Sequence, residues 1–327
     1  MTMARAASTS SLRRAVLVAC LLGVACVGAF AQDAQQLLEW GRADDAIRQL
    51  TPLAGGNAVA ANQLCRAYFS IGQWDNAVRQ CEHAVQMDGR NARFQLWLGR
   101  AYGEKAGAAS AFSAFSIARR SVAAFEAAHA LDRASEPIAR DLAEYYIQAP
   151  GIAGGGMGKA MALAKEMAAQ HPVTAAWIRA RAAGKQGDQA TADREYTESI
   201  RLSGNSAEMH LEYCRYLKGQ KQWELFDQHI AEALRSPRLR PQDRYDAADL
   251  LFRSGRNLTL AAGQMRAYIQ SGHPDEESPL FRAHYILGGI LNSMGDMDGA
   301  AAEYRDALAL ASGFRPARES LEKLHRS

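Results

Sequence analysis

A short motif recurs at a spacing of 34 residues, and this repeat restricts the fold more than any other feature of the sequence. Leu64-Cys65-Arg66-Ala67-Tyr68 returns as Leu98-Gly99-Arg100-Ala101-Tyr102, and Arg181 and Arg215 are separated by the same interval. Self-similarity at a period of about 20–50 residues is typical of stacked repeats, in which each unit buries its apolar face against the next. The spacing therefore predicts an array of similar units.

Each unit is expected to be a pair of antiparallel helices. Alanine is abundant and the 327 residues include only nine prolines, which favours helix throughout the chain. Glycines turn the chain between the paired helices, at Gly72, Gly187, Gly255 and Gly295. The predicted hairpins span about 33–55, 58–88, 92–132, 136–171, 173–203, 207–237, 241–272 and 281–312, and a last helix at about 316–325 caps the array.

The last unit shows the repeat pattern most clearly. Its characteristic residues are Leu287-Gly288, Leu291, Gly295-Asp296, Ala300 and Tyr304. This arrangement resembles the tetratricopeptide-repeat family, whose pattern is W-x2-L-G-x2-Y, then A-x3-F, then P. The resemblance covers essentially all of residues 33–325, with Gln95 or His284 at the early tryptophan position. It implies an all-α, right-handed superhelical solenoid of about seven to eight helical hairpins with a C-terminal capping helix.

The N-terminus has the pattern of an export signal. Arg5, Arg13 and Arg14 precede an apolar run, 15–31, that ends in Ala29-Phe30-Ala31. A basic segment, an apolar segment and an A-x-A site together predict a cleaved signal peptide at 1–31, followed by a mature domain at 32–327. Two alternatives are a lipid anchor at Cys20, within the lipobox-like 17–20, and an uncleaved anchor. The mature chain is expected to be exported, periplasmic in a two-membrane bacterium, and not stably inserted in the membrane.

The charge balance argues against nucleic acid as a partner. Without the three arginines of the predicted signal, the chain has 35 basic and 35 acidic residues. Binding driven by phosphate contacts requires an excess of Lys and Arg, which a neutral chain lacks. The expected partner is a protein or peptide.

The family resemblance also implies which residues face inward along the superhelix. They combine arginines, aromatic rings and a few polar side chains, and they are Asn62, Arg66, Phe69, Arg93, Arg100, Arg140, Trp177, Arg181, Arg215 and Tyr245. Arginine forks bind carboxylates in a bidentate manner while aromatic rings bury apolar groups, so these residues are candidates for a peptide-binding groove. The alternative is that the arginines pair with Glu or Asp of neighbouring units.

Cys65 and Cys81 are placed symmetrically about the turn of their own hairpin, near residue 73. They are candidates for a disulfide across the two helices. The alternatives are two small buried thiols or a redox-active pair, for which no C-x-x-C motif is present.

A glycine-rich insert at about 149–158 interrupts the repeats. Its Gly154–Lys159 segment approaches a phosphate-binding loop, but Ala160 stands where such a loop needs a hydroxyl, and no strand pattern precedes it. His210 and Cys214 have a spacing compatible with a metal site, but the sequence supplies no further ligands. We therefore expect no metal, no cofactor and no catalytic residue.

The function expected from the sequence is a non-enzymatic interaction scaffold, or an assembly or chaperone-like adaptor, of the bacterial envelope. It would bind a peptide or protein on its concave face. The alternative is a thiol-redox or nucleotide-dependent accessory protein that uses Cys65 and Cys81 or the Gly154–Lys159 loop.

Overall fold

The computed structural model describes residues 33–326, and this part of the chain contains helices and no strand. A helical segment at 33–39 comes first. It is followed by α2 (Ala43–Leu50), α3 (Ala58–Ser70), α4 (Trp74–Met87), α5 (Ala92–Ala108), α6 (Ala111–Leu131), α7 (Glu136–Gln148), the 3₁₀ turn η1 (Gly151–Ala153), α8 (Met157–Met167), α9 (Pro172–Gln186), α10 (Gln189–Leu202), α11 (Ala207–Gln220), α12 (Trp223–Arg235), α13 (Pro241–Arg253), α14 (Leu258–Gln270), α15 (Leu280–Ser293), α16 (Met297–Leu310) and α17 (Arg315–Leu324). The all-α hairpin array predicted from the sequence is confirmed.

Local sequence signals set the ends of these helices. The side chain of Asn57 accepts hydrogen bonds from the Val59 and Ala60 amides at the start of α3, and Asp188 caps α10 in the same way. Gly187, which follows α9, has a φ of 80°, a left-handed conformation that glycine adopts without strain. Short polar and glycine residues therefore define the hairpin turns.

Small residues allow the two helices of a hairpin to approach closely. A Cβ atom on Gly99 would lie 2.5 Å from the Phe125 ring, and one on Gly288 would lie 2.6 Å from the Tyr304 ring. These are the small and large partners expected at the closest approach of a tetratricopeptide-like hairpin. A larger residue at either glycine would force the helices apart.

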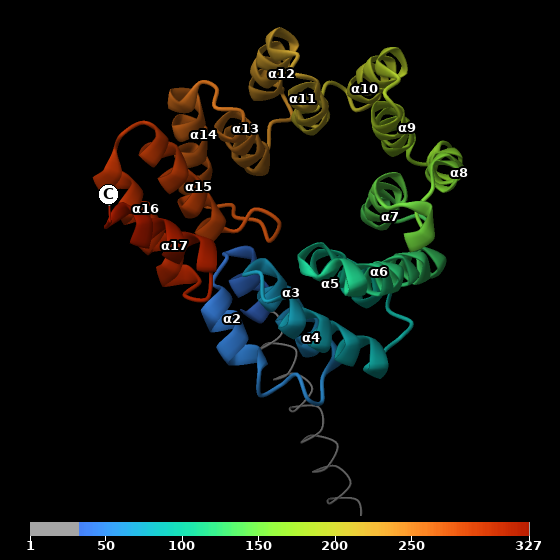
Figure 1. Cartoon of the computed structure of the whole chain (residues 1–327), viewed down its shortest axis with the longest axis horizontal. Helices are drawn as coiled ribbons and strands as arrows, with labels where there is room; N and C mark the ends of the chain where they lie inside the picture. Colours follow the sequence, from blue (N-terminus) through green and yellow to red (C-terminus); the bar gives the residue numbers. More distant parts are fainter. Residues whose placement is uncertain (1–32, 327) are drawn as a thin grey trace, which may run out of the picture.

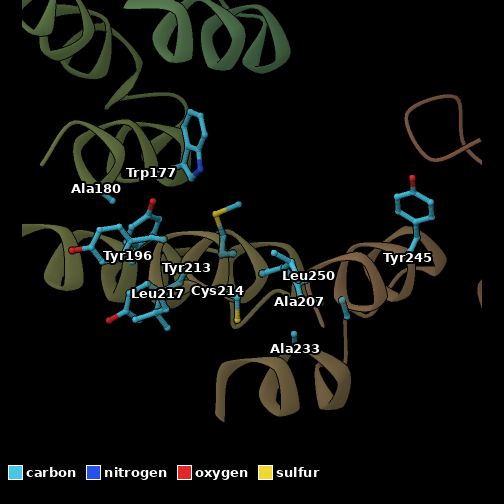
Figure 2. Packing of buried hydrophobic residues seen from close by; sticks show 14 of the residues in the cluster. Trp177, Ala180, Tyr196, Ala207, Tyr213, Cys214, Leu217, Ala233, Tyr245 and Leu250 are labelled. Carbon is cyan, nitrogen blue, oxygen red and sulfur yellow. The ribbon is translucent and has the colours of Figure 1, made fainter. Parts of the chain in front are cut away.

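Successive hairpins pack side by side and curve into a superhelix (Figure 1). The helices α3, α5, α7, α9, α11, α13 and α15 lie on the inner side, and their partners α4, α6, α8, α10, α12, α14 and α16 lie outside. Buried side chains join one unit to the next. Tyr196 of α10 stacks on Tyr213 of α11 with ring centroids 5.0 Å apart (Figure 2). The largest buried apolar cluster runs from Leu96 of α5 to Tyr304 of α16 and so crosses several units, as stacked repeats require.

The array curves until its first and last units touch (Figure 1). Ala43 and Ile71 share a buried apolar cluster with Phe281, Phe314 and Ala317. Two polar contacts add to this cluster. We name the cluster and these contacts together the closure contact. The Ser312 amide donates to Asp44 over 2.8 Å, and the Arg282 guanidinium donates to the Ser70 carbonyl over 2.9 Å. The described part of the chain is thus a closed ring of helical hairpins.

No helix among residues 33–326 has the length and apolar composition needed to cross a membrane. The predicted signal peptide at 1–31 lies outside the described residues.

Replacing Ile71 by Asp is expected to open the ring. Ile71 is 4% exposed and packs on the C-terminal units, so a carboxylate there would separate the two ends and forfeit about 1.5–3 kcal/mol of burial. Small-angle scattering should show a larger radius of gyration, and the unfolding midpoint in urea should fall.

The matched control is Phe226→Ala. Phe226 is fully buried in another part of the array, so its removal should lower stability without expanding the molecule. An unchanged radius of gyration in the stably folded Ile71→Asp variant would contradict the assignment of the closure contact.

Candidate functional site

The inner helices enclose a groove made of two adjoining cavities. The first has a volume of about 570 Å³ and the second about 760 Å³. Arg100, Asp141, Glu144 and Glu277 line both cavities, so the two are continuous. We call this combined space the concave groove. It spans α3, α5, α7, α9, α11 and α13.

Most of the residues expected to face inward do line the concave groove. Arg66, Phe69 and Arg100 line the first cavity, and Arg100, Arg140, Trp177, Arg181 and Arg215 line the second. Three others are outside it. Asn62 and Tyr245 are buried among the helices, and Arg93 is exposed and lines neither cavity, although it is near Arg66 and Glu276. The repeat register therefore locates the groove but not each of its contacts.

The groove arginines are bound to carboxylates of this chain. Arg100 pairs with Asp141 of α7 and with Glu277, and Arg181 pairs with Glu144. Arg140 pairs with Glu208 and Glu212, while Arg215 pairs with Glu212 and with Asp246 of α13 over 3.0 Å. The arginines were expected either to bind a peptide or to pair with acids of neighbouring units. The structure shows pairs with acids of neighbouring units. These pairs join α5 to α7, α7 to α9 and to α11, and α11 to α13.

Glu212 is the centre of the largest charge network. Burial alone would raise the pKa of this carboxyl, but Arg215 and Arg140 outweigh burial and lower it. The indole nitrogen of Trp177 also donates to Glu212 over 3.0 Å. Glu212 is therefore ionised and holds α7, α9 and α11 together.

Aromatic rings form the floor of the groove beneath these charges. The Arg100 guanidinium lies 4.7 Å from the centroid of Trp97, and that of Arg140 lies 4.6 Å from the centroid of Trp177. Phe69, Phe125 and Tyr145 extend the floor of the first cavity. Such stacked arginines are oriented by the rings as well as by their carboxylates.

The loop between α14 and α15 projects into the ring, toward α3 and α5 (Figure 1). This loop, residues 271–279, carries Glu276, which binds the Arg66 guanidinium through both carboxylate oxygens, with a Nε to Oε1 distance of 2.6 Å. Glu277 reaches Arg100 at 3.0 Å. In the sequence, the run of three acidic residues at 275–277 was the feature that pointed to these ion pairs. Their partners, Arg66 and Arg100, are distant in the sequence and come within reach only because the ring closes.

The lining of the groove is net acidic. Seven arginines face ten carboxylates, and exposure varies within both groups, from Arg240 at 56% to Glu212 at 13%. Glu277 is 71% exposed and Glu136 46%, whereas Arg66 is 2% and Arg100 19% exposed. A molecule that enters the groove would therefore meet an excess of acidic groups.

Cys65 and Cys81 are joined by a disulfide that bridges α3 and α4, and both residues are fully buried. The remaining described cysteine, Cys214, is also buried, and burial raises the pKa of its thiol. Buried sulfurs of this kind are suited to structural roles rather than to thiol exchange.

The glycine-rich insert packs as a tight turn against α7. A Cβ atom on Gly155 would lie 1.9 Å from the Ala149 carbonyl oxygen, so this position requires glycine. The Lys159 ammonium donates to the Gly154 carbonyl over 3.0 Å and to Glu126 over 3.2 Å. These contacts give the glycines and the lysine a packing role within the fold.

Comparison with known proteins agrees with this architecture. Residues 281–313 match the family model described as tetratricopeptide repeat. Yeast Tom70 superimposes with a TM-score of 0.52 at 12% identity, over 86% of this chain and 60% of the Tom70 chain. A thermophilic tetratricopeptide-repeat protein of Thermus thermophilus gives 0.47 at 16% identity, over 57% of this chain and 98% of its own. No curated protein matches the sequence.

These observations define an all-α superhelix of the tetratricopeptide-like class. Its unit at 281–313 is a tetratricopeptide repeat, and the match supports the family resemblance seen in the sequence. The fold is one that suggests a protein–protein interaction scaffold. Only about 60% of the Tom70 length is covered, and the likeness to Tom70 concerns the fold alone.

Removing the carboxylate partner of Arg66 should destabilise the protein strongly. In Glu276→Gln the buried guanidinium would lose its counter-charge, which costs about 3–5 kcal/mol for buried pairs. Glu277→Gln is the matched control, since Glu277 is mostly exposed and its loss should cost about 1 kcal/mol or less. Urea unfolding of the two variants measures the difference, and equal stabilities would contradict the buried-pair assignment.

Proposed function

We propose that this protein is an interaction scaffold of the bacterial envelope that holds an extended segment of a protein partner in the concave groove. The observation that carries this proposal is the continuous groove along the inner helices, with aromatic side chains on its floor and charges on its rim. Grooves of this kind recognise peptides by seating side chains in pockets while polar groups fix the register.

The rim favours a partner segment with apolar and basic side chains. The arginine forks already bind this chain's own carboxylates, so a partner's acids would have to displace Asp141, Glu144 or Glu276. The accessible carboxylates, among them Glu104 and Glu136, instead attract Lys and Arg. Apolar side chains of the segment would rest on Phe69 and Tyr145, which line the first cavity and are partly exposed.

Site-specific photocrosslinking in the native cell tests the groove. A photoreactive residue at Glu104, on the rim, should capture a discrete partner, whereas one at Gln86, exposed on the outer helix α4, should not. With the photoreactive residue kept at position 104, the double variant Glu136→Lys/Glu277→Lys should weaken that capture at least about tenfold, because it reverses the charge of two exposed rim residues. Equal crosslinking from both positions would contradict the proposal.

Export to an oxidising compartment is supported by the basic and apolar N-terminal segments and by the Cys65–Cys81 disulfide. Mass spectrometry of the protein isolated from its native cells should find an N-terminus at Gln32. After denaturation without reductant, alkylation should modify one thiol, that of Cys214. A lipidated N-terminus at Cys20, or three modified thiols, would contradict this part of the proposal.

A further inference from the structure

Two histidines and a glutamate converge on one point between α11 and α12. His210 Nδ1 lies 2.8 Å from His229 Nδ1 and 3.4 Å from a carboxylate oxygen of Glu232. The same Glu232 oxygen is 3.2 Å from His229 Nδ1. We name these three side chains the His210 cluster. The sequence spacing suggested Cys214 as the partner of His210 in a metal site. In the fold, His229 and Glu232 of α12 are the groups that lie next to His210.

Hydrogen bonding orients the His210 ring toward the cluster. Its Nε2 atom lies 2.9 Å from Asn205 Oδ1, which can only accept, so Nε2 carries the proton in the neutral ring. The lone pair is then on Nδ1, which faces His229 and Glu232. A ligating histidine commonly has its second nitrogen fixed in this way by an outer acceptor.

The surroundings keep both imidazoles neutral and leave one side of the cluster accessible. His210 is 2% exposed, His229 14% and Glu232 36%. Burial lowers the pKa of both histidines, and for His210 the neighbouring His229 lowers it further. The neutral form of imidazole is the one that binds metal ions.

The distances match the ligand spacing around a small divalent ion. Two donor atoms about 2.1 Å from a tetrahedral ion lie about 3.4 Å apart. The three separations in the His210 cluster are 2.8, 3.2 and 3.4 Å, so small side-chain rotations bring all three donors to bonding distance. We propose that His210, His229 and Glu232 form a binding site for a divalent transition-metal ion of the Zn²⁺ type.

The corresponding positions of two other hairpins hold a different kind of contact. In the unit α13–α14 the corresponding contact joins Arg244 and Gln264 at 2.7 Å. In α15–α16, residues His284, Glu303 and Asp306 lie 74 positions after the members of the His210 cluster, and His284 forms an ion pair with Glu303 at 2.7 Å. Each of these is a complementary polar pair. Without an ion, the two neutral imidazoles of the His210 cluster are joined by one N–H···N hydrogen bond, in which His229 Nδ1 donates to His210 Nδ1, and a metal ion would displace that proton and take both lone pairs.

The ligand set has chemical consequences. Two imidazole nitrogens and one carboxylate oxygen suit Zn²⁺ and related borderline ions rather than Mg²⁺ or Ca²⁺, which prefer oxygen ligands. Cys214 does not complete the set, because its Sγ is directed to the Phe226 carbonyl at 3.6 Å. Three protein ligands leave one tetrahedral position for water. The ion would also link α11 to α12, and so stabilise this hairpin.

Metal titration of the full mature chain without an affinity tag tests the site. After treatment with a chelator, calorimetry with ZnCl₂ should show one equivalent bound, and CoCl₂ should produce the visible absorption of a tetrahedral complex. His229→Gln and Glu232→Gln should each weaken Zn²⁺ binding at least about tenfold, and Zn²⁺ should raise the melting temperature of the wild type but not of His229→Gln.

Glu303→Gln is the matched control, since it changes the corresponding position of another hairpin and should leave Zn²⁺ binding unaltered. Far-ultraviolet circular dichroism identifies variants that keep the fold. Absence of stoichiometric Zn²⁺ binding, or equal binding by the folded His229→Gln variant, would overturn the proposal. Loss of binding in Glu303→Gln would overturn it as well, because it would assign the ion to the other hairpin.

Discussion

The contact between the turn after α3 and the turn before α17 determines the shape of everything between them. Ile71, Phe281 and Phe314 bury one another there, so the two ends of the array are fixed together. A superhelix with free ends can change its curvature through small movements at every hairpin. Closure removes that freedom, and the concave groove acquires a defined width and a defined set of facing residues.

Charge pairs along the inner helices reinforce this shape. Glu212 and Glu144 each hold side chains from neighbouring units, and Glu276 reaches Arg66 from a loop of the last units that closure brings next to α3. These arginines therefore have a double relation to function. They line the groove, but their main contacts are with carboxylates of this chain, so in the scaffold that we propose, recognition would depend on the partly exposed aromatic rings and on the acids of the groove.

The helical hairpins and their register could be predicted from the sequence, because they depend on residues close together in the chain. The 34-residue spacing, the small residues such as Gly99 and the turn glycines set the hairpins and their register, because helix pairing is decided within each unit. The acidic loop at 271–279 and the meeting of His210 with His229 were not foreseen. The contacts of the acidic loop depend on the accumulated curvature of the whole array. The meeting of the two histidines depends on how α11 and α12 are rotated about their axes, which the spacing of apolar residues sets only approximately.

Closure also changes how the protein loses structure. Linear repeat arrays fray from their terminal units, whose outer faces lack a neighbour. Here the first and last hairpins are neighbours, so neither can detach without uncovering Ile71 on one side and Phe314 on the other. The termini of the described chain therefore belong to one cooperative unit, and amide exchange in α3 and α16 should be as slow as in the middle of the array.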